Sequence, residues 1–142
     1  MKISEEGLSI IKHFEGLRLT AYLCPAGVLS IGYGHTGKDV VQGMTISVEK
    51  AIELLLGDVS GFEKSVSAMV TVPLTQGMFD ALVSFAFNMG AGKLKSSTLL
   101  KRLNDSDKDL AAEEFLKWDK ANGKPLAGLT ERRKDERMLF LS

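Results

Sequence analysis

The sequence predicts an α+β fold that is mainly α, with one small sheet near the N-terminus. Apolar residues recur three or four positions apart over most of the chain, which is typical of amphipathic helices. Only the stretch from Thr20 to Tyr33 is rich in β-prone residues around a turn signal. No internal repeat or linker-like segment divides the 142 residues, a length that suits a single domain.

The composition argues against several functional classes. Eighteen basic and eighteen acidic residues give a net charge of zero, so no basic field favours nucleic acid as a partner. The single cysteine, Cys24, excludes an internal disulfide and a metal site built on several cysteines, and we expect no metal and no cofactor. No apolar run approaches the roughly 18 residues of a membrane span. The N-terminus lacks the basic flank of a signal peptide, so we expect neither an export signal nor a membrane anchor.

The first predicted helix follows Ser4, the expected N-cap, and stops at Gly16. Glu15 continues the apolar stripe of Leu8 and Ile11 instead of lying on the polar face. Partial burial and the negative end of a helix both favour the protonated form of a carboxyl, so a glutamate placed there can act as a general acid. In the absence of other information, a helix-end glutamate that turns to solvent is the commoner case.

A β-hairpin is predicted next, with its turn at residues 25–27 (Pro-Ala-Gly). A three-residue loop places Cys24 opposite Val28 and Tyr22 opposite Ser30. Because side chains alternate between the two faces of a strand, these four side chains point the same way. Cys24 and Ser30 therefore share one face, although a lone cysteine is more often buried filler than a nucleophile.

Helices are predicted over the rest of the chain. A long amphipathic helix follows Ser47 and ends near Met69, and it could join two lobes. Thr75 is the expected N-cap of a strongly apolar helix that ends at Gly90 and forms the centre of the core. Three shorter helices are expected in SSTLLKRLN, DLAAEEFLKWDKA and LTERRKDERMLFL, which are residues 96–104, 109–121 and 129–141.

The segment EGLRLTAYLCPAGVLSIGYGHTG, residues 15–37, resembles the catalytic segment of the phage-type lysozymes, the endolysins of glycoside hydrolase family 24. The family motif is a glutamate, eight residues, an aspartate or cysteine, five residues and a threonine, followed by a GxGH stretch. The motif falls on Glu15, Cys24 and Ser30, and the stretch on Gly32, Gly34 and His35. Downstream, FDALVSFAFNMGAG is similar to the family's central helix, and GKPLAGLTERRKDERMLFL is similar to its C-terminal GL..RR..E element.

This resemblance implies a lysozyme-like fold in one catalytic domain, residues 1–142. We expect a small lobe over about 14–46 and a connecting helix over about 47–69. A helical lobe over about 70–142 would also include the N-terminal helix. We expect a monomer.

The activity implied by the resemblance is that of a muramidase, which hydrolyses the β-1,4 bond between N-acetylmuramic acid and N-acetylglucosamine in bacterial peptidoglycan. Glu15 would be the general acid, Cys24 would take the place of the aspartate or cysteine, and Ser30 that of the threonine that positions water or sugar. Arg132 matches an arginine that lies near the glutamate, although a solvated helix charge is equally expected. Asn88 falls where the family places an amide that lines the cleft, although an asparagine at a helix end needs no such role.

Two departures and two alternatives stay open. Ser30 keeps the hydroxyl of the usual threonine but loses the methyl group that stiffens χ1. A thiol with its ordinary pKa of about 8.5 is mostly neutral near neutral pH, so Cys24 must ionise or attack covalently to replace an aspartate. Its role as base, nucleophile or electrostatic helper is open. The stereochemical outcome of the reaction is open as well. The alternatives to a muramidase are a lytic transglycosylase and a wall-binding module without turnover.

The resemblance also implies a structural role for His35 and a cellular context. A phage endolysin of this kind would accumulate in the host cytoplasm and reach the wall when a holin opens the inner membrane.

Overall fold

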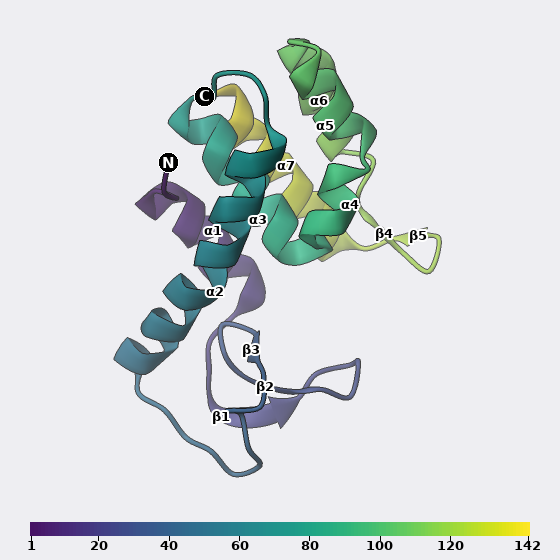
Figure 1. The fold of residues 1–142 in the computed structure, drawn as a ribbon. Coiled ribbons are helices and arrows are strands. Elements are labelled where there is room, and N and C mark those ends of the chain that lie inside the picture. The colour runs from purple at the N-terminus through teal and green to yellow at the C-terminus, as the bar shows by residue number, and fades with distance from the viewer.

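Two parts of unequal size make up the fold of residues 1–142 in the computed structural model (Figure 1). A helical lobe contains α1 (Glu5–Glu15), α3 (Gln76–Met89) and α7 (Ala127–Leu141) together with three shorter helices. The long helix α2 (Val48–Met69) leads into it from a small lobe, which is built on a three-stranded sheet. Both termini lie in the helical lobe, because α1 packs against α3 and α7 there. The predicted class, α+β and mainly α, is confirmed.

Helix α1 has the predicted ends, with Ser4 as N-cap and Gly16 as C-cap at a φ of +73°. The Ser4 side chain does not bond to its own helix. Instead, the backbone N–H of Ser4 donates to Asp80 Oδ1 at 3.0 Å, and its hydroxyl donates to Asp80 Oδ2. Asp80 is a buried residue of α3, so the core helix anchors the start of the helix that ends at Glu15.

The sheet of the small lobe is antiparallel, in the order β1-β2-β3, with the strands Arg18–Leu23, Leu29–Gly32 and His35–Thr36. Tyr22 pairs with Ser30, and the Cys24 N–H donates to the Val28 carbonyl at 3.0 Å, so the predicted register is confirmed. Gly27, at a φ of +78°, donates its N–H to the Cys24 carbonyl at 2.8 Å. This geometry is that of a three-residue hairpin loop that closes on a left-handed residue.

Helices α2 and α3 begin at the predicted caps. The Ser47 hydroxyl accepts from the N–H of Lys50, and the Thr75 hydroxyl accepts from the N–H of Met78. Helix α3 is buried continuously over residues 78–86 and packs against α1, α2, α4 (Ala91–Lys95) and α7. It contributes seven residues to a core of twenty buried residues, whereas a separate cluster of only four buried residues supports the sheet.

The structure corrects the prediction between residues 109 and 129. Helix α5 (Thr98–Asn104) is as expected, but α6 (Lys108–Phe115) ends six residues earlier than predicted. The chain then forms β4 (Lys120–Ala121) and β5 (Lys124–Pro125), a second sheet that was not predicted. Asn122 and Gly123, both at positive φ, form the two-residue turn between them. An Asn-Gly pair is the strongest short-range signal for such a turn, and it outweighs the helical spacing of the apolar residues.

Smaller differences concern the ends of elements. Helix α4 and strand β3 were not predicted, β1 begins two residues before Thr20, and α7 begins two residues before Leu129. A β-bulge lies between Arg18 and Tyr22 of β1. No helix of the chain combines the length and the apolar character that crossing a membrane requires.

Candidate active site

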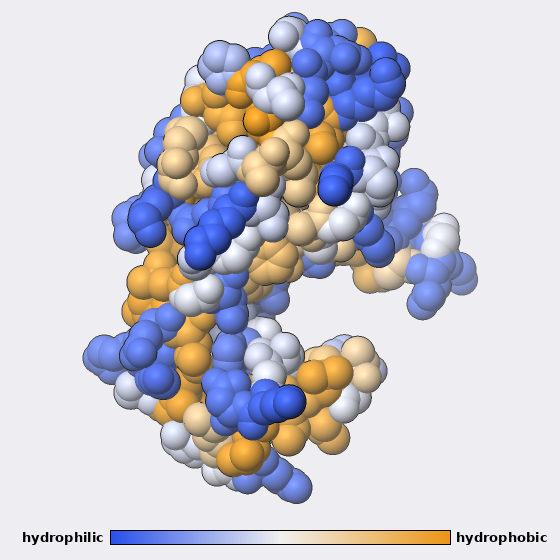
Figure 2. Space-filling model, viewed as in Figure 1, coloured by the Kyte–Doolittle hydropathy of each residue, from blue (hydrophilic) through white to orange (hydrophobic).

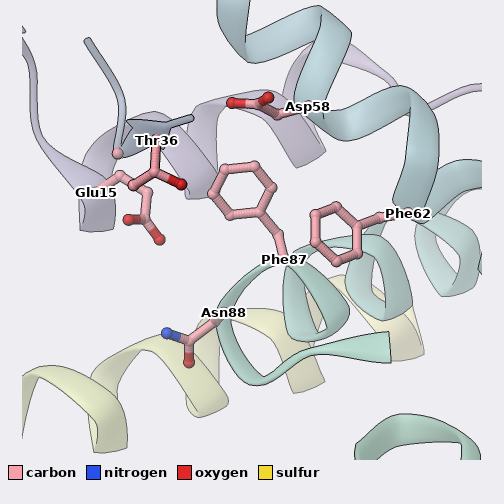
Figure 3. A pocket seen from close by; sticks show the side chains of 7 residues that line it. Glu15, Thr36, Asp58, Phe62, Phe87 and Asn88 are labelled. Atoms are coloured by element: carbon pink, nitrogen blue, oxygen red, sulfur yellow. The ribbon is translucent and has the colours of Figure 1, made fainter. Parts of the chain in front are cut away.

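A pocket of about 370 Å³ lies between the two lobes. The space-filling view shows the molecule hollowed on the side where the lobes face each other (Figure 2). The pocket is lined from four directions: the end of α1, the small lobe, α2 and α3. Its lining residues are Glu15, Gly34, Thr36, Asp58, Phe62, Phe87 and Asn88 (Figure 3).

Glu15, the last residue of α1, is held from behind by Arg132 of α7. Arg132 Nη1 lies 2.8 Å from Glu15 Oε2, and the two side chains are 3% and 23% exposed. The two residues are 117 positions apart in the chain. Of the two expectations for Arg132, a solvated helix charge and a partner of the glutamate, the geometry agrees with the second.

A buried ionic network continues behind Arg132. Its Nε donates to Glu136 Oε2 at 3.3 Å, and its Nη2 donates to the Ser84 carbonyl at 3.2 Å. Arg133 Nε lies 2.7 Å from Glu136 Oε1, and the Ser84 hydroxyl donates to Glu136 Oε2 at 2.5 Å. Burial raises the pKa of Glu136, and the charges of Arg133 and Arg132 oppose this rise. Burial lowers the pKa of Arg133, against the pull of Glu136.

Gly34 brings the backbone of the small lobe against the carboxylate of Glu15. A Cβ atom at this position would lie 3.0 Å from Glu15 Oε1, and the φ of Gly34 is +78°. Both the close contact and the left-handed conformation favour glycine. The second glycine of the GxGH stretch therefore has a physical reason in this structure.

Phe87 and Asn88 near the end of α3 line the pocket beside Phe62 of α2 (Figure 3). The rings of Phe62 and Phe87 lie 5.5 Å apart. The Oδ1 atom of Asn88 is buried and has no hydrogen-bond partner. A buried acceptor without a partner is unusual in a folded protein, and the residue that carries it lines the pocket.

Cys24 and Ser30 lie together on the hairpin, but neither lines the pocket. Hydrogen bonds from the backbone N–H groups of Val28 and Ala26 lower the pKa of the Cys24 thiol; burial opposes this effect and the Ser30 hydroxyl adds to it. Ser30 is buried, and its hydroxyl donates to the Val28 carbonyl at 3.2 Å.

His35 links the small lobe to α2. Its Nδ1 lies 2.8 Å from Asp58 Oδ2, and its Nε2 lies 2.9 Å from Asp39 Oδ2. Burial lowers the pKa of His35, but hydrogen bonds to both aspartates and their charges outweigh this effect and raise it. The histidine therefore connects β3 to α2 and to the following loop, which agrees with a structural role.

Several pocket residues were not singled out from the sequence. Thr36 pairs with Ser30 between β2 and β3, and Thr36 lines the pocket whereas Ser30 does not. Asp58 and Phe62 lie four positions apart and so share one face of α2. This spacing could have predicted from the sequence that the two side chains lie together. Phe87 lies just before Asn88 near the end of α3, but it stands in an apolar stretch in which nothing distinguishes it from a core residue.

The comparisons with known proteins agree along the whole chain. The family model of phage lysozyme matches residues 12–136. The endolysin of Salmonella phage P22 is 46% identical over all of this chain and 99% of its own length. The endolysin of Bacillus phage B103 is 51% identical over all of this chain. The chain spans 55% of the length of that relative and 56% of that of the endolysin of Bacillus phage PZA, little more than half of each.

Solved structures match equally well. The muramidase domain of SpmX from Asticaccaulis excentricus superposes with a TM-score of 0.93 at 41% identity, over 99% of this chain and 98% of that one. A mutant of P22 lysozyme superposes with a TM-score of 0.92 at 45% identity, over 100% and 99% of the two chains. The lysozyme-like fold is therefore confirmed, and the chain belongs to the phage lysozyme family.

Proposed function

We propose that this chain is a muramidase that hydrolyses the β-1,4 bond between N-acetylmuramic acid and N-acetylglucosamine in bacterial peptidoglycan. The observation that carries the proposal is the contact between Glu15 and the buried Arg132 at the wall of the interlobe pocket. The family and the solved neighbours named as a muramidase domain and a lysozyme support it. The chain would act as one catalytic domain over residues 1–142, as a monomer and without a cofactor.

Glu15 is the proposed general acid. It would donate its proton to the glycosidic oxygen as the bond from that oxygen to the sugar C1 breaks, and water would supply the oxygen that bonds to C1. Arg132, at 2.8 Å, would then stabilise the carboxylate that remains on Glu15. Water returns a proton to Glu15 at the end of the cycle, so no residue is consumed.

Cys24 and Ser30 are proposed to stabilise the positive charge that develops on the sugar and to position the water or the sugar. The lowered pKa of the Cys24 thiol makes its ionisation easier, and a thiolate would stabilise positive charge on the sugar as an aspartate would. The Ser30 hydroxyl already donates to the Val28 carbonyl, so its oxygen is left to accept a hydrogen bond from water or sugar.

Asn88 is proposed to bind substrate. Its side-chain amide lines the pocket and its Oδ1 has no partner within the protein, so the amide is suited to hydrogen-bond an N-acetyl group, and Phe62 and Phe87 offer apolar surface beside it. This arrangement matches the chemistry of a sugar that carries both an amide and a methyl group.

The relatives named endolysins support a role in lysis of the host. The protein would accumulate in the host cytoplasm and reach peptidoglycan when a holin opens the inner membrane. Peptidoglycan is then the partner on which the enzyme acts.

The test is clearing of outer-membrane-permeabilised Gram-negative cells by the parent and by Glu15→Gln, Cys24→Ser and Cys24→Asp. Glu15→Gln should abolish clearing, Cys24→Ser should lower it strongly, and Cys24→Asp should retain it. Glu5→Gln, on the exposed start of the same helix, is the matched control and should clear like the parent. Circular dichroism of each variant checks folding.

Mass analysis of the products separates hydrolysis from the alternative chemistry. A muramidase yields muropeptides that have gained one water, whereas a lytic transglycosylase yields anhydro products. If Cys24→Ser cleared like the parent and anhydro products appeared, the transglycosylase would replace the proposal. A folded Glu15→Gln variant that cleared cells as well as the parent would rule out both catalytic proposals.

A further inference from the structure

The Glu15–Arg132 contact raises a chemical difficulty for a general acid. A guanidinium at 2.8 Å favours the ionised form of a carboxyl, whereas a general acid must carry its proton before the reaction begins. The charge of Arg132 therefore has to be shared with another group if Glu15 is to hold a proton near neutral pH.

Glu136 is the residue placed to share it. The guanidinium of Arg132 uses a different nitrogen for each partner: Nη1 for Glu15, Nε for Glu136 and Nη2 for Ser84. Glu136 is completely buried, one turn after Arg132 on α7. The planar guanidinium is thus fixed between two carboxylates, one facing the pocket and one facing the core.

Arg133 and Ser84 oppose the effect of burial on Glu136. Burial alone favours a protonated carboxyl, but Arg133 Nε at 2.7 Å and the Ser84 hydroxyl at 2.5 Å both stabilise a carboxylate. The network thus contains two guanidiniums and two carboxyl groups. Of these four groups, only Glu15 lines the pocket.

We propose that Glu136 is a positioning residue for the general acid: it fixes Arg132 through Nε and competes with Glu15 for its charge, so that Glu15 can hold the proton it donates. This inference rests on the proposed function. Each element around Glu15 is accounted for. Arg132 faces it from α7; across the pocket α2 presents Asp58, which is paired with His35 of β3; and α3 presents the neutral Ser84 and Asn88.

The experiment is a carbon-13 NMR titration of the Glu15 carboxyl, assigned by its absence in Glu15→Gln, with a pH profile of cell clearing alongside. In Glu136→Gln, Glu15 becomes the sole carboxylate facing Arg132, so its titration midpoint should fall by about one pH unit. The alkaline limb of the clearing profile should move to lower pH by the same amount. Glu136→Asp, which keeps the charge, should restore most of the parent's profile.

Two further variants separate positioning from folding. Glu114→Gln removes another buried carboxyl, which pairs with Lys117 and does not contact Arg132, and it should leave both curves unchanged. The double variant Arg133→Met and Glu136→Met removes one charge of each sign, and such replacements of buried ion pairs are often tolerated. It should fold and show the same downward shift as Glu136→Gln.

The titration needs no substrate, so its outcome is independent of whether the chain cleaves peptidoglycan. An unchanged Glu15 midpoint in a folded Glu136→Gln or double variant would overturn the inference, as would an equal shift in Glu114→Gln. Failure of both Glu136 variants to fold would also overturn it, because Glu136 would then serve the fold itself. Activity of Glu15→Gln equal to that of the parent would instead contradict the proposed function.

Discussion

At Gly34 the backbone passes so close to Glu15 that any side chain would touch the carboxylate. We predict that Gly34→Ala lowers the clearing rate at least tenfold, because its Cβ would lie 3.0 Å from Glu15 Oε1 and displace the acid. The left-handed φ adds a stability loss of about 1 kcal/mol, measured by urea unfolding.

Gly43 provides a matched control for this prediction. It has a φ of +83° but open space where a Cβ would stand, so Gly43→Ala carries the backbone strain without the contact. Equal losses of clearing in the two variants would show that strain, and not the position of Glu15, limits the activity of Gly34→Ala.

Asn88 is expected to separate binding from stability. Because its Oδ1 has no partner, Asn88→Ala should change the free energy of unfolding by less than about 0.5 kcal/mol. The same variant should raise KM several-fold, measured as clearing rate against cell density, because the pocket loses an amide group that can hydrogen-bond to the substrate.

The control for Asn88 is Asn104, whose side-chain oxygen and nitrogen both make hydrogen bonds within the protein. It donates to the Met69 carbonyl at 3.0 Å and accepts from the Thr71 N–H at 2.9 Å. Asn104→Ala should therefore destabilise the protein by about 1–3 kcal/mol and leave KM unchanged. The reverse pattern, with stability lost at Asn88 and KM changed at Asn104, would contradict the assignment of Asn88 to the substrate.

At the scale of elements, the link between β3 and α2 should depend on pH. The pKa of His35 is raised in the folded protein, so the stability it contributes is fully present below its unfolded pKa of about 6.5. That contribution is lost as the pH rises through the raised folded value. The free energy of urea unfolding of the parent minus that of His35→Asn should thus be larger at about pH 5.5 than at about pH 8.5.

His13→Asn, at an exposed position of α1, is the control and should show no such difference. A stability difference between parent and His35→Asn that stays constant across this pH range would mean that the imidazole acts through packing and not through its charge.

At the scale of the whole molecule, the two lobes have cores of very different size. The core of the helical lobe, centred on α3, contains twenty buried residues, whereas the sheet rests on Ile31, Val40, Ile46 and Ala51. Because local opening is easiest where few apolar contacts are lost, the small lobe should open while the helical lobe stays folded.

Native-state hydrogen exchange measures this directly. Amides of β1 and β2 should exchange at least about a hundredfold faster than those in the middle of α3. Equal protection in both lobes would show that the chain opens only as a unit, with α2 transmitting stability from one lobe to the other.

Elements whose signals are local could be predicted from the sequence. Ser47 and Thr75 cap α2 and α3 as predicted, and the turn at residues 25–27 sets the pairing of Tyr22 with Ser30. Caps, turns and apolar spacing act over a few residues, so a short window of sequence contains the interactions that decide them. The position of Glu15 at the end of α1 could be predicted for the same reason.

The surroundings of Glu15 depend on contacts between residues that are far apart in the chain. The partnership with Arg132 joins residues 117 positions apart, and Thr36 replaces Ser30 in the pocket because β3 adds a third strand. Likewise, the unpartnered Oδ1 of Asn88 and the buried charge of Glu136 appear only once the lobes and helices pack. Such contacts depend on long-range packing and on burial, and these set the local electrostatics. Residue types and their spacing along the chain do not specify them.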